Sequence, residues 1–184
     1  MPHRPVPTVA VHRSGFTLLE LVIVIAITVV LGAMTLPSYN SLVSRQRLVA
    51  AAHGLQAEIA FAREEASRRG QPVYLVFQPG PRWCYAIGTL ATVDCQGQAP
   101  AVGSPVIKVV RATDHPGIEL GQATTMALDG RNGSSLLGEG QARFASAHGL
   151  QLQVRLGPLG RSAVCAPGAP VAGTPTCRPA AVPG

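Results

Sequence analysis

Three patterns of hydrophobic and polar residues follow one another along the chain, and each predicts a different structure. The first is an apolar run over residues 16–36, which is interrupted by few other residues, namely Thr17, Glu20, Thr28, Gly32 and Thr35. A helix of this length is about 30 Å long, which matches the hydrocarbon thickness of a bilayer. The run therefore predicts one membrane-spanning helix, which is unusual in carrying a carboxylate near its start.

The second pattern is an apolar stripe at helical spacing. Pro37 comes first and predicts a kink or a break, because proline removes a backbone hydrogen bond and its ring clashes with the preceding turn. After it, apolar residues recur at steps of four and three, at Leu48, Ala52, Leu55, Ile59, Ala62 and Ala66. This stripe predicts that residues 37–70 form an amphipathic helix with one face on a core.

The end of this helix is also marked in the sequence. Glu64 with Arg68, and Glu65 with Arg69, are spaced i,i+4 in the favourable order and predict two ion pairs. Gly70 is placed to cap the carboxyl end of the helix. A single helix is thus expected from residue 16 to about residue 69.

Beyond Gly70 the hydrophobic period changes from about four to two, which predicts short strands between turns rich in glycine and proline. The expected strands are 73–77, 83–87, 106–110, 124–128, 142–146 and 150–156. Segment 129–140 is expected to be an exposed loop, and 166–184 a loop and tail. The architecture implied is α+β, with a long helix covering an antiparallel sheet.

Composition narrows the class of protein. The chain has 184 residues, of which 47% are hydrophobic and 13% charged, with a formal net charge of +6. This length suits one domain with a modest core. A charge surplus this small is typical of a solvated surface and indicates an anionic partner only weakly.

Four cysteines occur in two close pairs, at Cys84, Cys95, Cys165 and Cys177. Their spacings fit neither a CxxC metal site nor a redox dithiol, and they favour disulfides formed in an oxidising compartment. Three pairings exist. We favour local closure, Cys84 with Cys95 and Cys165 with Cys177, over the other two and over buried free thiols. Disulfides place the C-terminal part outside the cytosol and the N-terminus inside it.

A cleaved secretory signal is the alternative explanation of the apolar run. Such a signal has an apolar core of about 7 to 15 residues followed by a small-x-small cleavage site. The run here is longer, and the sequence that follows it, "GAMTLPSY", contains no convincing site of this kind. We therefore expect the segment to be retained.

The stretch "SGFTLLELVIVIAI" closely resembles the leader-peptidase motif of type IV pilins and pseudopilins. The resemblance implies a leader of residues 1–15, which a prepilin peptidase removes between Gly15 and Phe16 before methylating the new amine of Phe16. It also implies an assembly role for Glu20, the fifth mature residue, whose carboxylate pairs with that amine on a neighbouring subunit. Pro37 stands at an offset where such proteins often carry proline. A plain membrane anchor with an accidental glutamate is the alternative.

The rest of the chain resembles the GspH/FimT group of minor pilins and pseudopilins, through "AREEASRRGQPVYLVF" and "RFASAHGLQLQVRLGPLGR". This implies a pilin-like fold and a structural subunit of a filament, with the prepilin peptidase and other pilin-like subunits as partners. It implies a single-pass protein of the bacterial inner membrane with a periplasmic domain. The expected parts are a leader, a core helix, an amphipathic helix, a β-rich domain and a tail, at 1–15, 16–36, 37–70, 71–165 and 166–184. We favour a type IV pilus over type II secretion.

The sequence offers little support for catalysis or for nucleic-acid binding. The sequence contains no known catalytic motif, and we expect no enzyme activity, metal or cofactor. Some FimT-type minor pilins bind DNA through a Gly-Arg-x-Arg stretch, but the matching residues 160–163 lack the second arginine. Arg155, Arg161 and Arg178 are candidates for a small DNA-binding surface, although solvated loop arginines are the preferred interpretation, because three phosphate contacts give weak affinity at physiological salt.

Overall fold

The computed structural model describes residues 15, 17–97, 100–101 and 103–177, with backbone alone at 33–38. The chain divides into two compact units, Met1–Tyr39 and Asn40–Gly184. Its elements, in order, are α1 (Leu18–Arg69), β1 (Val73–Gln78), β2 (Cys84–Gly88), β3 (Val106–Arg111), the short 3-10 helix η1 (Ala112–Asp114), β4 (Ile118–Ala123), β5 (Met126–Leu128), β6 (Gly140–Ser146), β7 (Gln151–Leu156) and β8 (Ser162–Cys165).

Helix α1 has the predicted apolar stripe and the predicted end. All six stripe residues from Leu48 to Ala66 are buried. At the carboxyl end Gly70 has a φ of 63°, its N–H donates to the Ser67 carbonyl, and the Gln71 N–H donates to the Ala66 carbonyl. These two bonds form a Schellman cap, so the prediction for Gly70 is confirmed. Of the kink or break predicted at Pro37, the break is absent, because one helix continues through this position; a single missing N–H leaves the other helical bonds in place.

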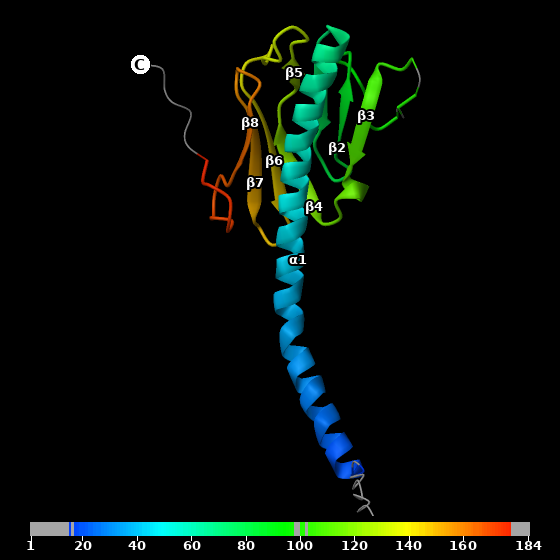
Figure 1. Ribbon diagram of the computed structural model, residues 1–184, viewed down its shortest axis with the longest axis vertical. Coiled ribbons are helices and arrows are strands. Elements are labelled where there is room, and N and C mark those ends of the chain that lie inside the picture. Colours follow the sequence, from blue (N-terminus) through cyan, green and yellow to red (C-terminus); the bar gives the residue numbers. More distant parts are fainter. Residues whose placement is uncertain (1–14, 16, 98–99, 102, 178–184) are drawn as a thin grey trace, which may run out of the picture. The chain divides into compact units, whose positions relative to one another are not determined.

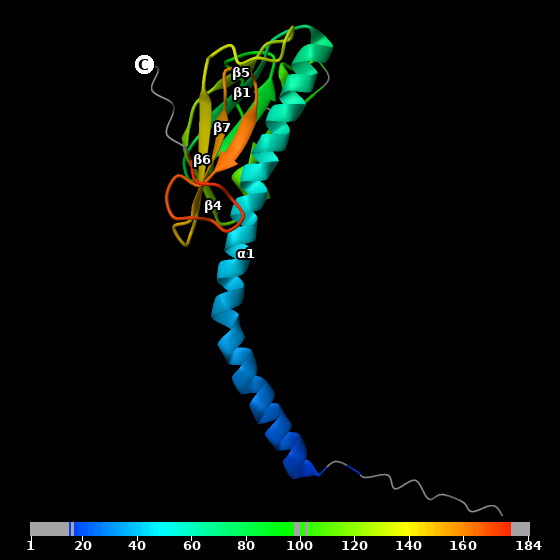
Figure 2. The same ribbon diagram turned by 60° about the vertical axis from the view of Figure 1, so that its left-hand side comes forward.

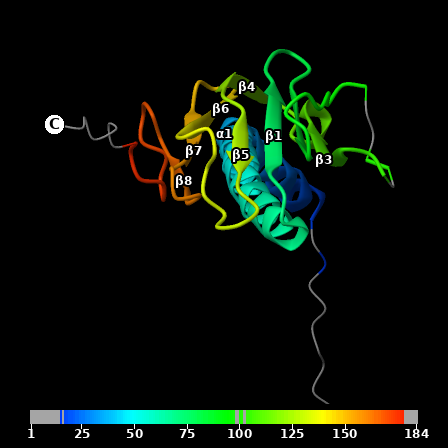
Figure 3. The same ribbon diagram turned by 90° about the horizontal axis from the view of Figure 1, so that it is seen from above.

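The β-rich part of the second unit contains two four-stranded antiparallel sheets, where the sequence predicted one. Their strand orders are β3-β2-β1-β5 and β4-β6-β7-β8. Figure 1 shows the C-terminal half of α1 crossing the strands, with β7 and β8 on one side of it and β2 and β3 on the other. Figures 2 and 3 show that the strands of both sheets lie along one side of this helix.

One core joins the helix to both sheets. Buried residues of α1 pack with buried residues of β1 and β2 and with those of β6 and β7. Trp83, which precedes β2, is buried in this core and donates from its indole Nε1 to the Ile118 carbonyl in β4 at 2.7 Å. Trp83 is therefore a core residue that fastens one sheet to the other.

A second, smaller core lies around the first disulfide, Cys84–Cys95. Every residue of β2 is buried, since α1 covers one face of this strand, and Val93 and Cys95 of the following loop pack on the other. The disulfide fixes that loop to the strand beneath it. The local pairing predicted from the spacing is confirmed.

The second disulfide, Cys165–Cys177, also confirms the predicted pairing. It closes a loop after β8 that folds back along the strand end, with a parallel bridge between Ala166 and Thr176. Val171 of this loop is 3% exposed and belongs to the main core. Arg45 of α1 donates from Nη2 to the Ala172 carbonyl at 2.6 Å. The two ends of the loop are therefore fastened to each other at the end of β8, and its middle is attached to the helix.

All six predicted strands are present, although the strand expected at 124–128 is reduced to residues 126–128. Two strands were missed, β4 and β8. In β4 the alternation of buried and exposed residues lasts only from Ile118 to Leu120 before a glycine, and β8 has only four residues. Segment 129–140 is mainly a loop, as predicted, but Gly130 and Gly133 within it are buried.

Candidate functional site

The predicted cleavage position lies next to the start of helix α1. Gly15 is exposed and belongs to no helix or strand. Thr17 is likewise outside the helix, which begins at Leu18. Phe16, the predicted new N-terminus, lies outside the described residues. The described backbone on both sides of the predicted scissile bond is thus non-helical.

Thr17 and Glu20 are linked at the first turn of the helix. The Glu20 N–H donates to the Thr17 Oγ1 at 3.2 Å, which is the bond that an N-cap residue makes to an otherwise unpaired backbone donor. The Glu20 side chain is exposed and stands in the first turn, where a carboxylate is favoured by the helix dipole. The sequence pattern Thr-x-x-Glu is the signature of a capping box. The cap could therefore have been predicted from the sequence. Glu20 therefore has a local structural role that the sequence reasoning missed.

The following helical residues present apolar side chains on all sides. From Leu18 to Leu31 the large hydrophobic residues are exposed, between 48% at Val24 and 80% at Leu18. Such a surface requires a covering of lipid or of other protein chains. No helix in the described residues is both long and apolar enough to cross a membrane. The predicted span 16–36 includes Phe16 and the side chains of 33–36, which lie outside those residues, as does the side chain of Pro37.

Two of the three candidate arginines, Arg155 and Arg161, belong to the described residues and lie in different surroundings. The Arg155 guanidinium lies 3.2 Å from the Glu139 carboxylate, which offsets its charge. Arg161 is exposed in the turn between β7 and β8, and it lines a groove with Arg63 of α1. Arg178 lies outside the described residues. Arg63 was not singled out from the sequence, because only the folded chain places it beside the turn.

The C-terminal turn of α1 carries a charged cluster centred on Glu65. This carboxylate is 3% exposed and accepts hydrogen bonds from Arg69 Nε at 2.5 Å and from Arg68 Nε at 3.0 Å. The predicted Glu65–Arg69 pair is confirmed, whereas the predicted Glu64–Arg68 pair is wrong, because Arg68 binds Glu65 instead. The hydrogen bond from Arg69 lowers the pKa of Glu65, burial opposes this, and Arg68 lowers the pKa further.

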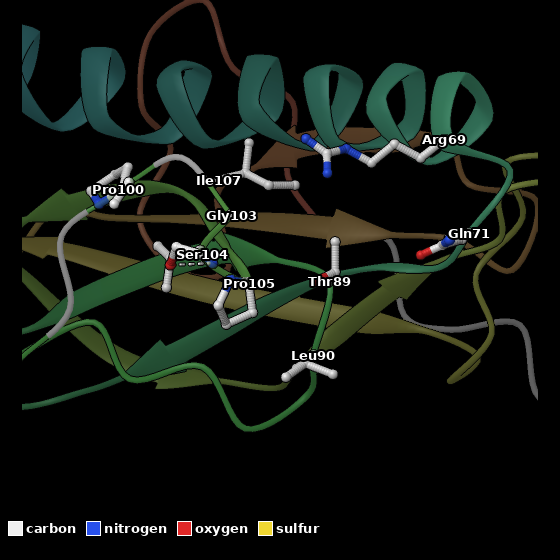
Figure 4. A pocket seen from close by; sticks show the side chains of 11 residues that line it. Arg69, Gln71, Thr89, Leu90, Pro100, Gly103, Ser104, Pro105 and Ile107 are labelled. Atoms are coloured by element: carbon white, nitrogen blue, oxygen red, sulfur yellow. Dashed lines mark hydrogen bonds between the residues drawn. The ribbon is translucent and has the colours of Figure 1, made fainter.

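A pocket of about 830 Å³ lies beside this helix end. Figure 4 shows Arg69 extending from α1 over a hollow bounded by Thr89, Leu90 and the segment around Pro105. Arg69 is the single charged residue among the pocket's described lining residues, and its guanidinium is bound to Glu65. The pocket therefore offers no group poised for chemistry.

Comparisons with known proteins place these features in context. The family model described as type II transport protein GspH matches residues 51–160, which is more than half of the chain. A model of the prokaryotic N-terminal methylation motif matches residues 11–36. The curated proteins include no match to the chain.

Two solved structures resemble the fold, both of the type IV minor pilin FimU from Pseudomonas aeruginosa PAO1 in different crystal forms. Their sequences are 17% and 18% identical to this chain, with TM-scores of 0.47 and 0.48. The alignments cover 64% of this chain and 91% and 87% of the two FimU chains.

Proposed function

The chain belongs to the GspH family of type II transport proteins, and from this premise we propose how its parts serve an assembled filament. It is a minor pilin or pseudopilin, a structural subunit of a type IV pilus or of a type II secretion system. The observation that carries this function is that helix α1 joins an N-terminal methylation motif, residues 11–36, to a GspH domain, residues 51–160. A processed N-terminal segment and a folded domain thus belong to one chain, and helix α1 contributes to both.

Processing is the first step that we propose. A prepilin peptidase cuts between Gly15 and Phe16 and methylates the new amine of Phe16. The exposed, non-helical position of Gly15 supports this, because a peptidase needs an accessible extended chain. The mature chain then consists of the core helix, 16–36, followed by the amphipathic helix, 37–70. The β-rich domain and the tail, 71–165 and 166–184, complete it.

Docking is the second step. Before cleavage the Phe16 nitrogen is an amide, so the Glu20 carboxylate has no cationic partner there. After cleavage the positive amine of one subunit pairs with Glu20 of its neighbour, and in apolar surroundings this attraction is much stronger than in water. The Thr17 cap supports the proposal, since it fixes the first helical turn that holds Glu20. Cleavage therefore switches on a contact that fixes the register of the incoming subunit.

Before assembly the subunit resides in the inner membrane, with its second unit in the periplasm. The exposed apolar side chains from Leu18 to Leu31 support membrane contact. The two disulfides, Cys84–Cys95 and Cys165–Cys177, support an oxidising compartment for the folded domain. On this account the protein acts by assembly and has no catalytic activity of its own.

A tagged chain expressed in its own cells tests the function. The tag is expected in sheared or purified filaments when the prepilin peptidase is present, and in the inner membrane alone when it is absent. A deletion strain identifies the filament: loss of surface pili with normal secretion assigns a type IV pilus, and loss of protein secretion with normal pili assigns type II secretion. Absence of the tag from both kinds of filament would contradict the proposal.

A further inference from the structure

A groove with charged walls lies between helix α1 and the turn that joins β7 to β8. Its volume is about 490 Å³. Arg63 and Glu64 line it from the helix, and Arg161 lines it from the turn. Ile59 and Ala60 contribute an apolar wall. All three charged side chains are exposed, so the groove is open to a partner.

The charges in this groove have no ionic partners among the described residues. Arg68 and Arg69, the next cations toward the carboxyl end of the helix, are both bound to Glu65. Glu64 therefore lacks the i,i+4 pair that its position would otherwise give, and neither Arg63 nor Arg161 has an acidic partner in the described part of the chain. A partner chain that removes water from these charges must supply opposite charges to pair with them, since an unpaired buried charge is costly.

Local contacts hold the β7–β8 turn and the Arg63 side chain in place. The Gly157 N–H donates to the Arg161 carbonyl at 2.9 Å, and the Gly160 N–H donates to the Gly157 carbonyl at 2.9 Å, so the turn is closed by its own hydrogen bonds. The Arg63 side chain lies close to Gly133 of the neighbouring loop. A β carbon added to Gly133 would be 2.4 Å from Arg63 Nε. Rigid walls reduce the entropy that an incoming group must lose.

The residues of the groove fit a protein better than a nucleic acid. Glu64, which lines the same groove as the two arginines, repels a chain of phosphates, but it can accept hydrogen bonds from a basic side chain. The described lining contains no aromatic residue on which a base could stack. A mixed pattern of charges beside an apolar wall is instead typical of the rim of a protein interface.

We propose that this groove receives an acidic side chain of a neighbouring filament subunit, whose carboxylate lies between Arg63 and Arg161. A basic residue of the same neighbour reaches Glu64. The inference rests on the proposed function, because it requires filament neighbours. The groove of one subunit meets a different surface of the next, and such head-to-tail contacts generate helical filaments rather than closed dimers. The contact is separate from the Glu20 contact of the N-terminal helix.

Charge reversal in the full-length chain, in its own cells, tests the proposal. We expect Arg161→Glu and Arg63→Glu each to lower the amount of the chain in filaments about tenfold or more, as for loss of one buried ionic contact. Arg82→Glu is the matched control, since Arg82 is an exposed arginine outside the groove and its reversal changes the net charge equally. Leader removal should be the same in all four chains, which shows that the variants insert and reach the peptidase.

The neighbour is identified with a photocrosslinking residue at Ser67, which lines the groove. We expect a crosslink to a pilin-like subunit of the same filament. Replacing one acidic residue of that subunit with Arg should restore the filament content of the Arg161→Glu chain to within about twofold of the wild type. Normal incorporation of both groove variants, or an equal loss with Arg82→Glu, would overturn the inference. Binding of a double-stranded DNA fragment that Arg161→Glu abolishes, without any subunit crosslink, would also overturn it. If the wild-type chain itself never enters filaments, the proposed function fails instead.

Discussion

Gly160 lies against Gly133 so closely that a β carbon on Gly160 would be 1.9 Å from the Gly133 carbonyl oxygen. This contact joins the turn between β7 and β8 to the loop between β5 and β6. Gly160 also has a φ of 73°, a backbone conformation that other residues rarely adopt. Any side chain at this position would push the two loops apart.

We therefore predict that Gly160→Ala lowers the free energy of unfolding by about 2–4 kcal/mol, because backbone atoms cannot move aside as a flexible side chain can. Chemical denaturation of a fragment containing residues 40–184 measures the effect. Gly168→Ala is the control, since no atom lies within 4 Å of the β carbon that it would add. Equal stability of the two variants would show that the loops are not packed as described.

The C-terminal disulfide provides a second prediction. Replacing both Cys165 and Cys177 with Ser should lower the free energy of unfolding by about 3 kcal/mol, as expected for a closed loop of this length. The loop should also become more sensitive to protease, because Val171, the Arg45–Ala172 hydrogen bond and the bridge between Ala166 and Thr176 then hold it without a covalent link. Limited proteolysis with mass analysis locates the cuts. Cleavage elsewhere in the domain, with this loop intact, would contradict the prediction.

Glu65 makes the domain sensitive to acid. Its folded pKa is lowered from the usual value of 4.5, so its stabilising effect is complete above that value and is lost as the pH falls through the folded pKa. We predict that Glu65→Gln costs about 1–3 kcal/mol at neutral pH, and that the difference from the wild type shrinks below about pH 4.5. Unfolding curves at several pH values measure it. A difference that stays constant with pH would show that the carboxylate charge is not involved.

Glu20 tests the docking step separately from processing. Glu20→Ala should lose its leader normally, because Glu20 lies beyond the cleaved bond and its backbone N–H can still bind Thr17. It should enter filaments poorly, because the amine of the neighbour then has no carboxylate to pair with. Comparison of leader removal with filament content measures both. Glu119→Ala, which removes an exposed carboxylate from β4, is the control, and equal filament content of the two variants would contradict the docking step.

The sequence predicted those features that depend on residues close together in the chain. The stripe ending at Ala66, the cap at Gly70 and both disulfides follow from local spacing, and all are present. The division of the strands into two sheets could not be predicted, because it depends on pairings between distant segments, such as Val73 with Leu128.

The charged groove depends on tertiary structure in the same way. Helical spacing allowed Arg68 to bind either Glu64 or Glu65. In the folded chain Arg68 and Arg69 both bind the buried carboxylate of Glu65, where charge pairing gains most because less water competes. Only this arrangement leaves Glu64 available in the groove with Arg161.

Intact-mass analysis of the full-length chain, with and without a prepilin peptidase, tests the central claim most directly. With the active peptidase the account predicts loss of residues 1–15 and addition of one methyl group to Phe16, and with an inactive peptidase it predicts the unprocessed mass. An unchanged mass in the presence of an active peptidase, or a cut at any other bond, would contradict the account.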